Sequence, residues 1–127
     1  MRYVKISRDE AQKIAKLHEG ALGKSYRDLL FSEGTIIGKE IARIADRERF
    51  FETAAKLVAG RGWTDEIVFE KGRAIATGSF DAGERGCERL RGIVAALYEN
   101  QSGKVDVQET ECEGRGADNC VFIVKKR

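Results

Sequence analysis

The stretch of sequence that determines the fold is residues 105–124, VDVQETECEGRGADNCVFIV. Its first part alternates apolar and polar residues and its last part is apolar, which is the pattern of two strands. The segment between them, residues 113–119, is polar and rich in glycine, as a tight turn requires. The stretch therefore predicts a β-hairpin with one cysteine at each end of its turn, Cys112 and Cys120.

A second hairpin is expected upstream. Residues 64–70 and 74–80 are short runs rich in apolar and β-branched side chains, joined by Lys-Gly-Arg. Between the two hairpins, Asp81 and Glu84 indicate the start of a helix. Its predicted buried face consists of Cys87, Leu90, Val94, Leu97 and Tyr98.

The first 60 residues have the periodicity of helices. Ser7 and Glu10 have the spacing of a capping box, and Gly23 is expected to end the helix that they open. A further helix is predicted over residues 48–59, before Gly60.

The helix expected between these two has Ser25, with Asp28, as its candidate N-cap and has two glycines one turn apart, Gly34 and Gly38. Since each glycine in a helix costs about 1 kcal/mol relative to alanine, close approach of another backbone is the expected reason for them. The predicted buried stripe is Leu30, Gly34, Ile37, Ile41 and Ile44.

The order of elements predicts an α+β fold with helices packed on one side of an antiparallel sheet. A chain of 127 residues with 42% hydrophobic residues suits one domain with one core. The formal net charge of +2 argues against a nucleic-acid-binding surface. The beginning of the sequence does not resemble a signal peptide, and the longest apolar run, residues 93–97, is too short to span a bilayer. A cytoplasmic location without membrane insertion is the expectation.

Three cysteines and a carboxylate form the candidate site: Cys87, Glu109, Cys112 and Cys120. Zinc binds thiolates and carboxylates in tetrahedral geometry, and four protein ligands make a closed, structural site. The spacing alone leaves another interpretation open, in which Cys112 and Cys120 form a disulfide and Cys87 fills the core. Glu111 competes with Glu109 for the carboxylate role. Because side chains alternate along a strand, Glu109 and Glu111 would lie on one face and Cys112 on the other, so the strand must bend or end near Thr110 for Glu109 and Cys112 to converge.

The surroundings of these residues suggest how their charge is balanced. Cys87 lies near a predicted helix N-terminus, where the helix dipole favours a thiolate. Arg85, Arg89 and Arg115 are close in sequence and are expected to offset the negative charge of the ligands.

The sequence resembles the V4R (vinyl-4-reductase) domain family. The resemblance covers residues 61–124, and its motifs are Gly62-Trp63, Cys87-x₄-Gly92 and Val105-x-Val107-x-Glu109-x₂-Cys112-x₃-Gly116-x₃-Cys120-x-Phe122-x-Val124. It implies a fold related to trafficking-complex subunits and a zinc ion held by the cysteines and Glu109, which occupies the family's carboxylate position. We therefore expect a single V4R-like domain over residues 1–127, with a helical part (1–60) and a V4R motif region (61–125).

The resemblance also implies a small-molecule pocket between helices and sheet. Relatives that sense aromatic compounds hold a phenolic hydroxyl with a histidine from the second helix, where this chain has Ile36, Ile37 and Gly38. This difference predicts a more apolar ligand. The candidate wall residues are Trp63, Phe31, Ile37, Phe51, Phe69 and Tyr98.

The function expected from these observations is a zinc-stabilised domain that binds or senses a hydrophobic or aromatic molecule and acts through a homodimer or a partner. A non-enzymatic role is expected, since the sequence has neither a nucleotide-binding loop nor a nucleophile–base pair. Two alternatives stay open. One is a protein-interaction module without ligand, dimerising through the face around Gly34 and Gly38, and the other is an accessory protein of tetrapyrrole reduction.

Overall fold

The computed structural model describes residues 2, 4–83 and 85–127, so Glu84 lies outside the described residues. Three helices come first, α1 (Arg8–Leu22), α2 (Ser25–Ile44) and α3 (Phe50–Gly60). They are followed by β1 (Glu66–Glu70), β2 (Arg73–Thr77), α4 (Glu88–Ser102), β3 (Val105–Glu111), the short 3₁₀ helix η1 (Glu113–Arg115) and β4 (Cys120–Lys126). The predicted order of helices and hairpins is confirmed.

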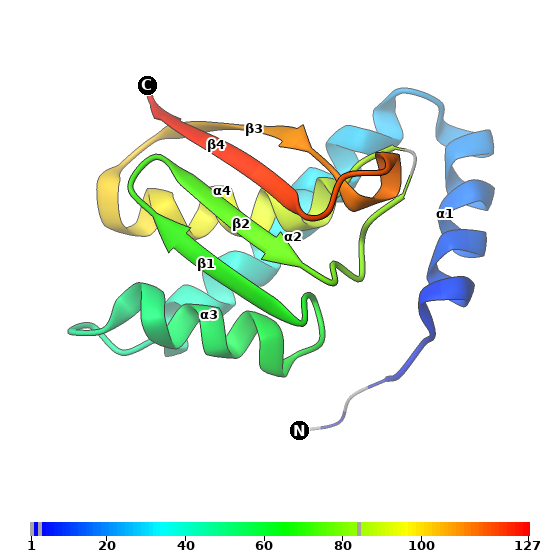
Figure 1. Cartoon of the computed structure of the whole chain (residues 1–127). Coiled ribbons are helices and arrows are strands. Elements are labelled where there is room, and N and C mark those ends of the chain that lie inside the picture. The colour runs from blue at the N-terminus through cyan, green and yellow to red at the C-terminus, as the bar shows by residue number, and fades with distance from the viewer. Residues whose placement is uncertain (1, 3, 84) are drawn as a thin grey trace.

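The four strands form one antiparallel sheet in the order β1-β2-β4-β3. Figure 1 shows the helices on one side of this sheet, with α4 directly against it and α2 behind α4. The alanines Ala74 and Ala76 on β2 are fully buried and belong to the main core. Phe122 on β4 occupies the centre of the same face. The predicted α+β fold with helices on one side of the sheet is therefore correct.

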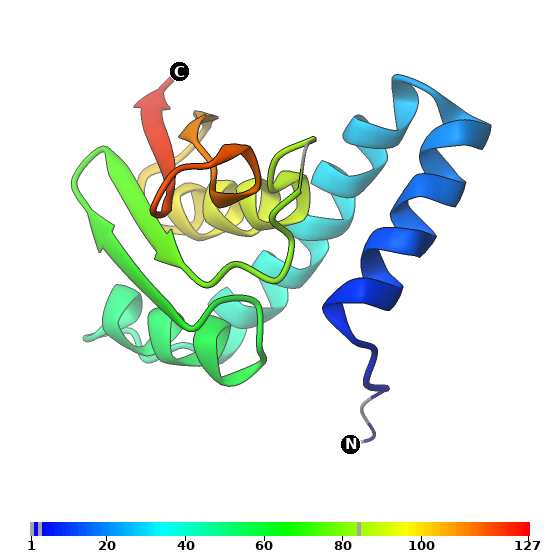
Figure 2. The same cartoon turned by 45° about the vertical axis from the view of Figure 1, so that its right-hand side comes forward.

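Helix α1 forms a hairpin with the beginning of α2 and lies at one end of the molecule (Figure 2). The capping box at its start is present, because Ser7 Oγ accepts from the Glu10 amide while the Glu10 carboxylate accepts from the Ser7 amide. Only Ala11 and Ala15 of α1 are buried, and Ala15 belongs to a small cluster with Tyr26 and Leu30, separate from the main core. Helix α1 is thus attached to the domain over a small apolar surface.

Close packing of α2 on α4 is the main contact between helices. A Cβ atom added to Gly34 would lie 2.0 Å from the Arg89 carbonyl oxygen, and one added to Gly38 would lie 2.8 Å from the Ile93 carbonyl oxygen. Gly92 on α4 has the same role, since its Cβ would lie 2.2 Å from the Phe31 carbonyl oxygen. The expected close approach is correct. The Gly34–Gly38 face is covered by α4 of the same chain, so the suggestion of a dimer face there is wrong.

Three details differ from the sequence predictions. Ser25 is the first residue of α2, and its N-cap is Lys24 without a side-chain cap. Ile44, predicted to be buried, is 44% exposed at the last residue of α2. Helix α4 begins at Glu88, later than Asp81 suggested; Asp81 instead accepts from the amides of Arg89 and Leu90 across a loop.

Among the described residues, none of the helices combines the length and the apolar character that crossing a membrane would require.

The glycine packing gives a stability prediction. Replacing Gly34 by alanine should destabilise the protein by about 2–4 kcal/mol, because the added methyl group meets the α4 backbone. Gly20, in α1, is the matched control, since its Cβ would meet nothing within 4 Å. Gly20→Ala should stabilise by about 0.5–1 kcal/mol. Urea unfolding of both variants tests this, and equal effects would contradict the account of α2–α4 packing.

Candidate metal centre and adjoining groove

Three thiols and one carboxylate meet in a small space between the two hairpins. One ligand atom from each of Cys87, Glu109, Cys112 and Cys120 lies within 4.8 Å of every other. The Sγ atom of Cys87 is 3.8 Å from that of Cys112 and 3.5 Å from that of Cys120, and the latter two are 3.9 Å apart. All three cysteines are buried, and Glu109 is half-buried.

A β-bulge brings Glu109 and Cys112 together. Glu109 pairs with Phe122 on β4, but Glu111 pairs with the adjacent Val121, so one extra residue of β3 is accommodated at Thr110. The bulge reverses the alternation of side chains beyond it. Cys112 therefore shares the inner face with Glu109, whereas Glu111 points away from the cluster and is exposed. The bend expected near Thr110 is confirmed.

The cysteines are not disulfide-bonded. A disulfide holds its sulfur atoms about 2.05 Å apart, and the 3.9 Å between Cys112 and Cys120 excludes that interpretation for this structure. The pKa of the Cys87 thiol is raised by its hydrogen bond with Cys120, by burial and by the nearby Glu109 charge. This is opposite to the lowering expected from the helix N-terminus. Burial, with Glu109 next in effect, raises the pKa of Cys112 to about 11.

The two oxygens of Glu109 have different surroundings. Oε1 accepts a hydrogen bond from the Cys87 amide at 2.9 Å, and Oε2 is buried without a hydrogen-bond partner among the described residues. Gly86 makes this possible: a Cβ atom there would lie 2.6 Å from Oε1, and its φ of +87° is one that other residues rarely adopt. Among the residues that the structure describes, none donates a hydrogen bond to Oε2, which is costly unless a cation is close.

These features fit a zinc ion. A tetrahedral ion with Zn–S bonds of about 2.3 Å separates its sulfur ligands by roughly 3.8 Å, close to the 3.5–3.9 Å between the three Sγ atoms. The unpartnered Oε2 atom of Glu109 completes a set of four donors. Thiolate sulfur also favours zinc over magnesium or calcium, which prefer oxygen ligands.

Polar groups that the sequence analysis missed hold the cysteine loops in place. Glu113 accepts hydrogen bonds from the amides of Gly78 and Ser79 at 3.0 and 2.9 Å. Burial alone would raise the pKa of Glu113, but these amides and the Cys120 thiol outweigh it and lower the pKa. The Ser79 hydroxyl lies 3.3 Å from the sulfur of Cys87. Glu113 and Ser79 therefore link the end of the first hairpin to the cysteine cluster. No local sequence signal indicates this contact, because the two segments are distant in sequence.

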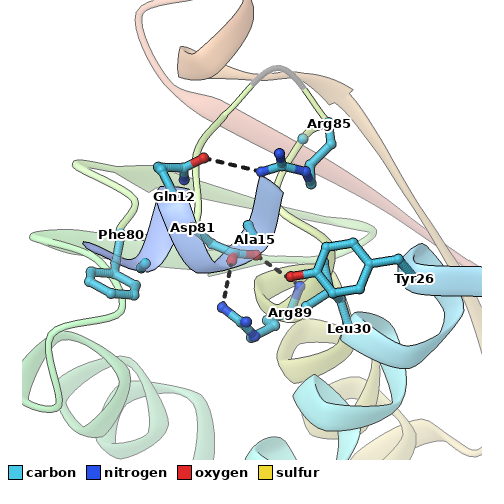
Figure 3. Close-up of a pocket in the computed structure, with 10 residues that line it drawn as sticks. Gln12, Ala15, Tyr26, Leu30, Phe80, Asp81, Arg85 and Arg89 are labelled. Atoms are coloured by element: carbon cyan, nitrogen blue, oxygen red, sulfur yellow. Dashed lines mark hydrogen bonds and ion pairs between the residues drawn. The ribbon is translucent and has the colours of Figure 1, made fainter. Parts of the chain in front are cut away.

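Two of the three arginines expected near the cysteines have other partners. Figure 3 shows Arg85 bonded to Gln12 of α1, and Arg85 also pairs with Glu19 at 3.1 Å. Arg89 lies beside the Asp81 carboxylate. For these two the expected role in balancing charge at the cysteines is wrong. The third, Arg115, lies beside Gly86 and lines a surface depression together with Glu109.

Asp81 joins the loop before α4 to the helix itself. Its Oδ2 atom accepts from the Arg89 amide at 2.8 Å and its Oδ1 atom lies 3.4 Å from Nη1 of Arg89. Burial raises the pKa of Asp81, and the Arg89 charge and the helix amides oppose that shift. Beside this pair a cavity of about 10 Å³, lined by Tyr26 among others, has room for one water molecule.

A groove of about 570 Å³ runs between α2 and the loops on either side of the first hairpin. Trp63 and Phe80 stack edge to face at 5.9 Å and form one wall, and Ile37 from α2 contributes another. The remaining lining residues are Val4, Lys5, Ile6, Glu33, Arg61, Gly62 and Arg89. The volume is within the usual range for small-molecule sites.

The other predicted wall residues lie elsewhere. Phe51, Phe69 and Tyr98 pack on one another at centroid distances of 5.0–5.9 Å and line a second, open cavity of about 560 Å³ beside β1 and β4. The ring of Phe31 lies under the guanidinium group of Arg91, at 4.2 Å. The six candidates are therefore divided between two cavities and one surface contact.

Sequence reasoning missed the charged residues of the groove, Glu33 and Arg89 among them, and its second aromatic residue, Phe80. Glu33 precedes a glycine of the buried stripe and Arg89 follows Cys87 by two positions, so only the α2–α4 contact brings them together. No spacing within either helix reveals that contact.

Comparison with known proteins identifies the region that carries the cysteines. The V4R domain model matches residues 71–126. A search of curated proteins finds no relative that matches this chain.

Two solved structures share the fold. The phenol-responsive sensory domain of the transcription activator PoxR, solved with phenol, is 17% identical, with a TM-score of 0.81 over 99% of this chain and 77% of that one. A vinyl-4-reductase family protein from Methanocaldococcus jannaschii is 18% identical, with a TM-score of 0.70 over 99% of this chain and 85% of that one. Residues 71–126 of this chain therefore match the V4R domain model, and the helices that precede them complete the fold that both structures share.

Proposed function

We propose that this chain is a zinc-stabilised domain that binds a small hydrophobic or aromatic molecule and acts through a dimer or another partner. The observation that carries the proposal is the groove of about 570 Å³ beside Trp63, Phe80 and Ile37. A module that served only to hold other proteins would need no such cavity. The fold shared with a phenol-responsive sensory domain supports the same function.

Zinc has a structural role in this proposal. Cys87, Glu109, Cys112 and Cys120 are its ligands, and four protein donors leave no coordination position for substrate or a reactive water. A bound ion would supply the positive charge that the buried thiols and the free carboxylate oxygen need. The proposed role is therefore binding rather than catalysis.

The proposed ligand set predicts different results for two neighbouring glutamates. Glu109→Gln keeps the size and an oxygen acceptor for the Cys87 amide but removes the charge at the metal, so zinc affinity should fall at least about 100-fold. Glu111→Gln, one position beyond the bulge and exposed, should leave the affinity unchanged. Competition with a chromogenic zinc chelator measures both. Equal affinities for the two variants would contradict the assignment of Glu109.

The proposed groove predicts ligand-dependent stability. A small aromatic molecule that fits the groove should raise Tm, with a stabilisation of about 2.7 kcal/mol at a concentration of 100 Kd. Ile37→Gln should weaken binding roughly tenfold by removing an apolar wall. Ile44→Gln, on the same helix outside the groove, is the control.

Thermal unfolding with a panel of one-ring and two-ring aromatic alcohols and acids provides the measurement. A panel in which no compound shifts Tm, or a loss that is equal for the Ile37 and Ile44 variants, would count against the groove as the binding site.

The proposal includes a homodimer. Apolar side chains remain exposed on the outer helices, with Leu17 72%, Leu29 47% and Ile36 70% exposed, and a second copy of the chain would cover such a surface. Sedimentation equilibrium should give twice the mass of the chain, and Leu17→Glu should shift the equilibrium toward the monomer. A monomer at every concentration would rule out the dimer without affecting the groove.

A further inference from the structure

The groove contains a charged end that a purely apolar ligand would not use. Arg89, from the first turn of α4, lines it next to Glu33 of α2, and the aromatic pair of Trp63 and Phe80 lies on the same groove. Lys5 and Arg61 are the other basic residues of the lining, while Glu33 is its only acidic residue among those described. The lining therefore favours a negatively charged group over a neutral one.

The guanidinium group of Arg89 has more N–H donors than its described neighbours accept from. Arginine presents five N–H donors in a fixed fork, and within the described part of the chain the Arg89 side chain makes one hydrogen bond, from Nη1 to Asp81 Oδ1 at 3.4 Å. The nearest Glu33 oxygen is 3.8 Å from Nε, which is too long for a hydrogen bond. Because the side chain is only 19% exposed, water satisfies the remaining donors incompletely.

Asp81 fixes the orientation of this group. Its carboxylate accepts from both the amide and the side chain of Arg89, and the close-up shows it directly beside the guanidinium group (Figure 3). A carboxylate from a ligand in the groove would find the N–H groups that neither Asp81 nor Glu33 accepts from, on a fork whose position is already set. Arginine binds carboxylates in this way with two parallel hydrogen bonds.

The rest of the groove suits an apolar body attached to that anion. Trp63 and Phe80 present an edge-to-face pair, and Ile37, Val4 and Ile6 add aliphatic surface. Aromatic rings pack well against such walls. We propose that the ligand of this groove is an aromatic carboxylate whose acid group pairs with Arg89 and whose ring lies against Trp63, Phe80 and Ile37.

This inference rests on the proposed function and makes it more specific. The lack of a histidine on α2 predicted a more apolar ligand, and Arg89 was expected to act at the cysteines. The structure directs Arg89 to Asp81 and the groove instead. In this proposal the ligand carries an acid group that pairs with Arg89, in place of the phenolic hydroxyl that a histidine would hold.

Two probes of the same shape test the proposal. Isothermal titration of the full zinc-loaded chain with 2-naphthoate and with neutral 2-naphthalenemethanol should show roughly tenfold or greater preference for naphthoate, as expected for a charge-assisted pair. Equal affinities would overturn the carboxylate proposal while leaving the binding function in place. Failure of both probes to bind would overturn both.

Variants locate the acid group. Arg89→Lys keeps the positive charge beside Asp81 but loses the fork, so the preference for naphthoate should fall severalfold while binding of naphthalenemethanol stays the same. Arg127→Met, which removes an exposed arginine outside the groove, is the control and should change neither affinity. A preference that survives Arg89→Lys in full but is lost in Lys5→Gln or Arg61→Gln would overturn the assignment to Arg89.

Discussion

Three buried sulfur atoms and one carboxylate oxygen share a space only a few ångströms across, and this constraint ties the loop before α4 to the second hairpin. They come from the loop that enters α4, the end of β3 and the start of β4. A buried carboxylate oxygen without a donor is costly, as Glu109 Oε2 is in the described structure. The zinc ion that we propose would remove this cost and join the two hairpins to α4 at a single point.

The position of α4 in turn determines where the groove lies. Cys87 is the N-cap residue of α4, and Arg89, two residues later, lines the groove. Gly34, Gly38 and Gly92 then bring α2 against α4 with backbone contacts, which places Ile37 and Glu33 opposite the aromatic pair. The candidate metal centre and the candidate ligand site are therefore joined through the first turn of α4, which contributes to both.

Much of this could be predicted from the sequence because its signals are local. The capping box, the two hairpins, the spaced glycines and the four residues of the cluster all stand out from spacing or from family motifs. Even the bulge at Thr110 follows from requiring Glu109 and Cys112 to share a face. For the capping box, the hairpins and the glycines, one element or two adjacent ones contain the information, and the family motifs supply it for the cluster.

The polar contacts between distant segments could not be predicted in this way. Glu113 caps the amides of Gly78 and Ser79, which are more than 30 residues away. Arg85, in the loop before α4, and Arg89, in the first turn of α4, are close to Cys87 in sequence, but their side chains contact α1 and Asp81 instead of the cysteines. The direction of a long side chain depends on tertiary packing, which a single sequence does not contain.

The most direct test of the account is X-ray absorption at the zinc edge on freshly purified protein. The account predicts about one zinc per chain, with three sulfur ligands near 2.3 Å and one oxygen ligand near 2.0–2.2 Å. Protein without stoichiometric metal, or a zinc ion bound by nitrogen, by fewer than three sulfur atoms or by several waters, would contradict it.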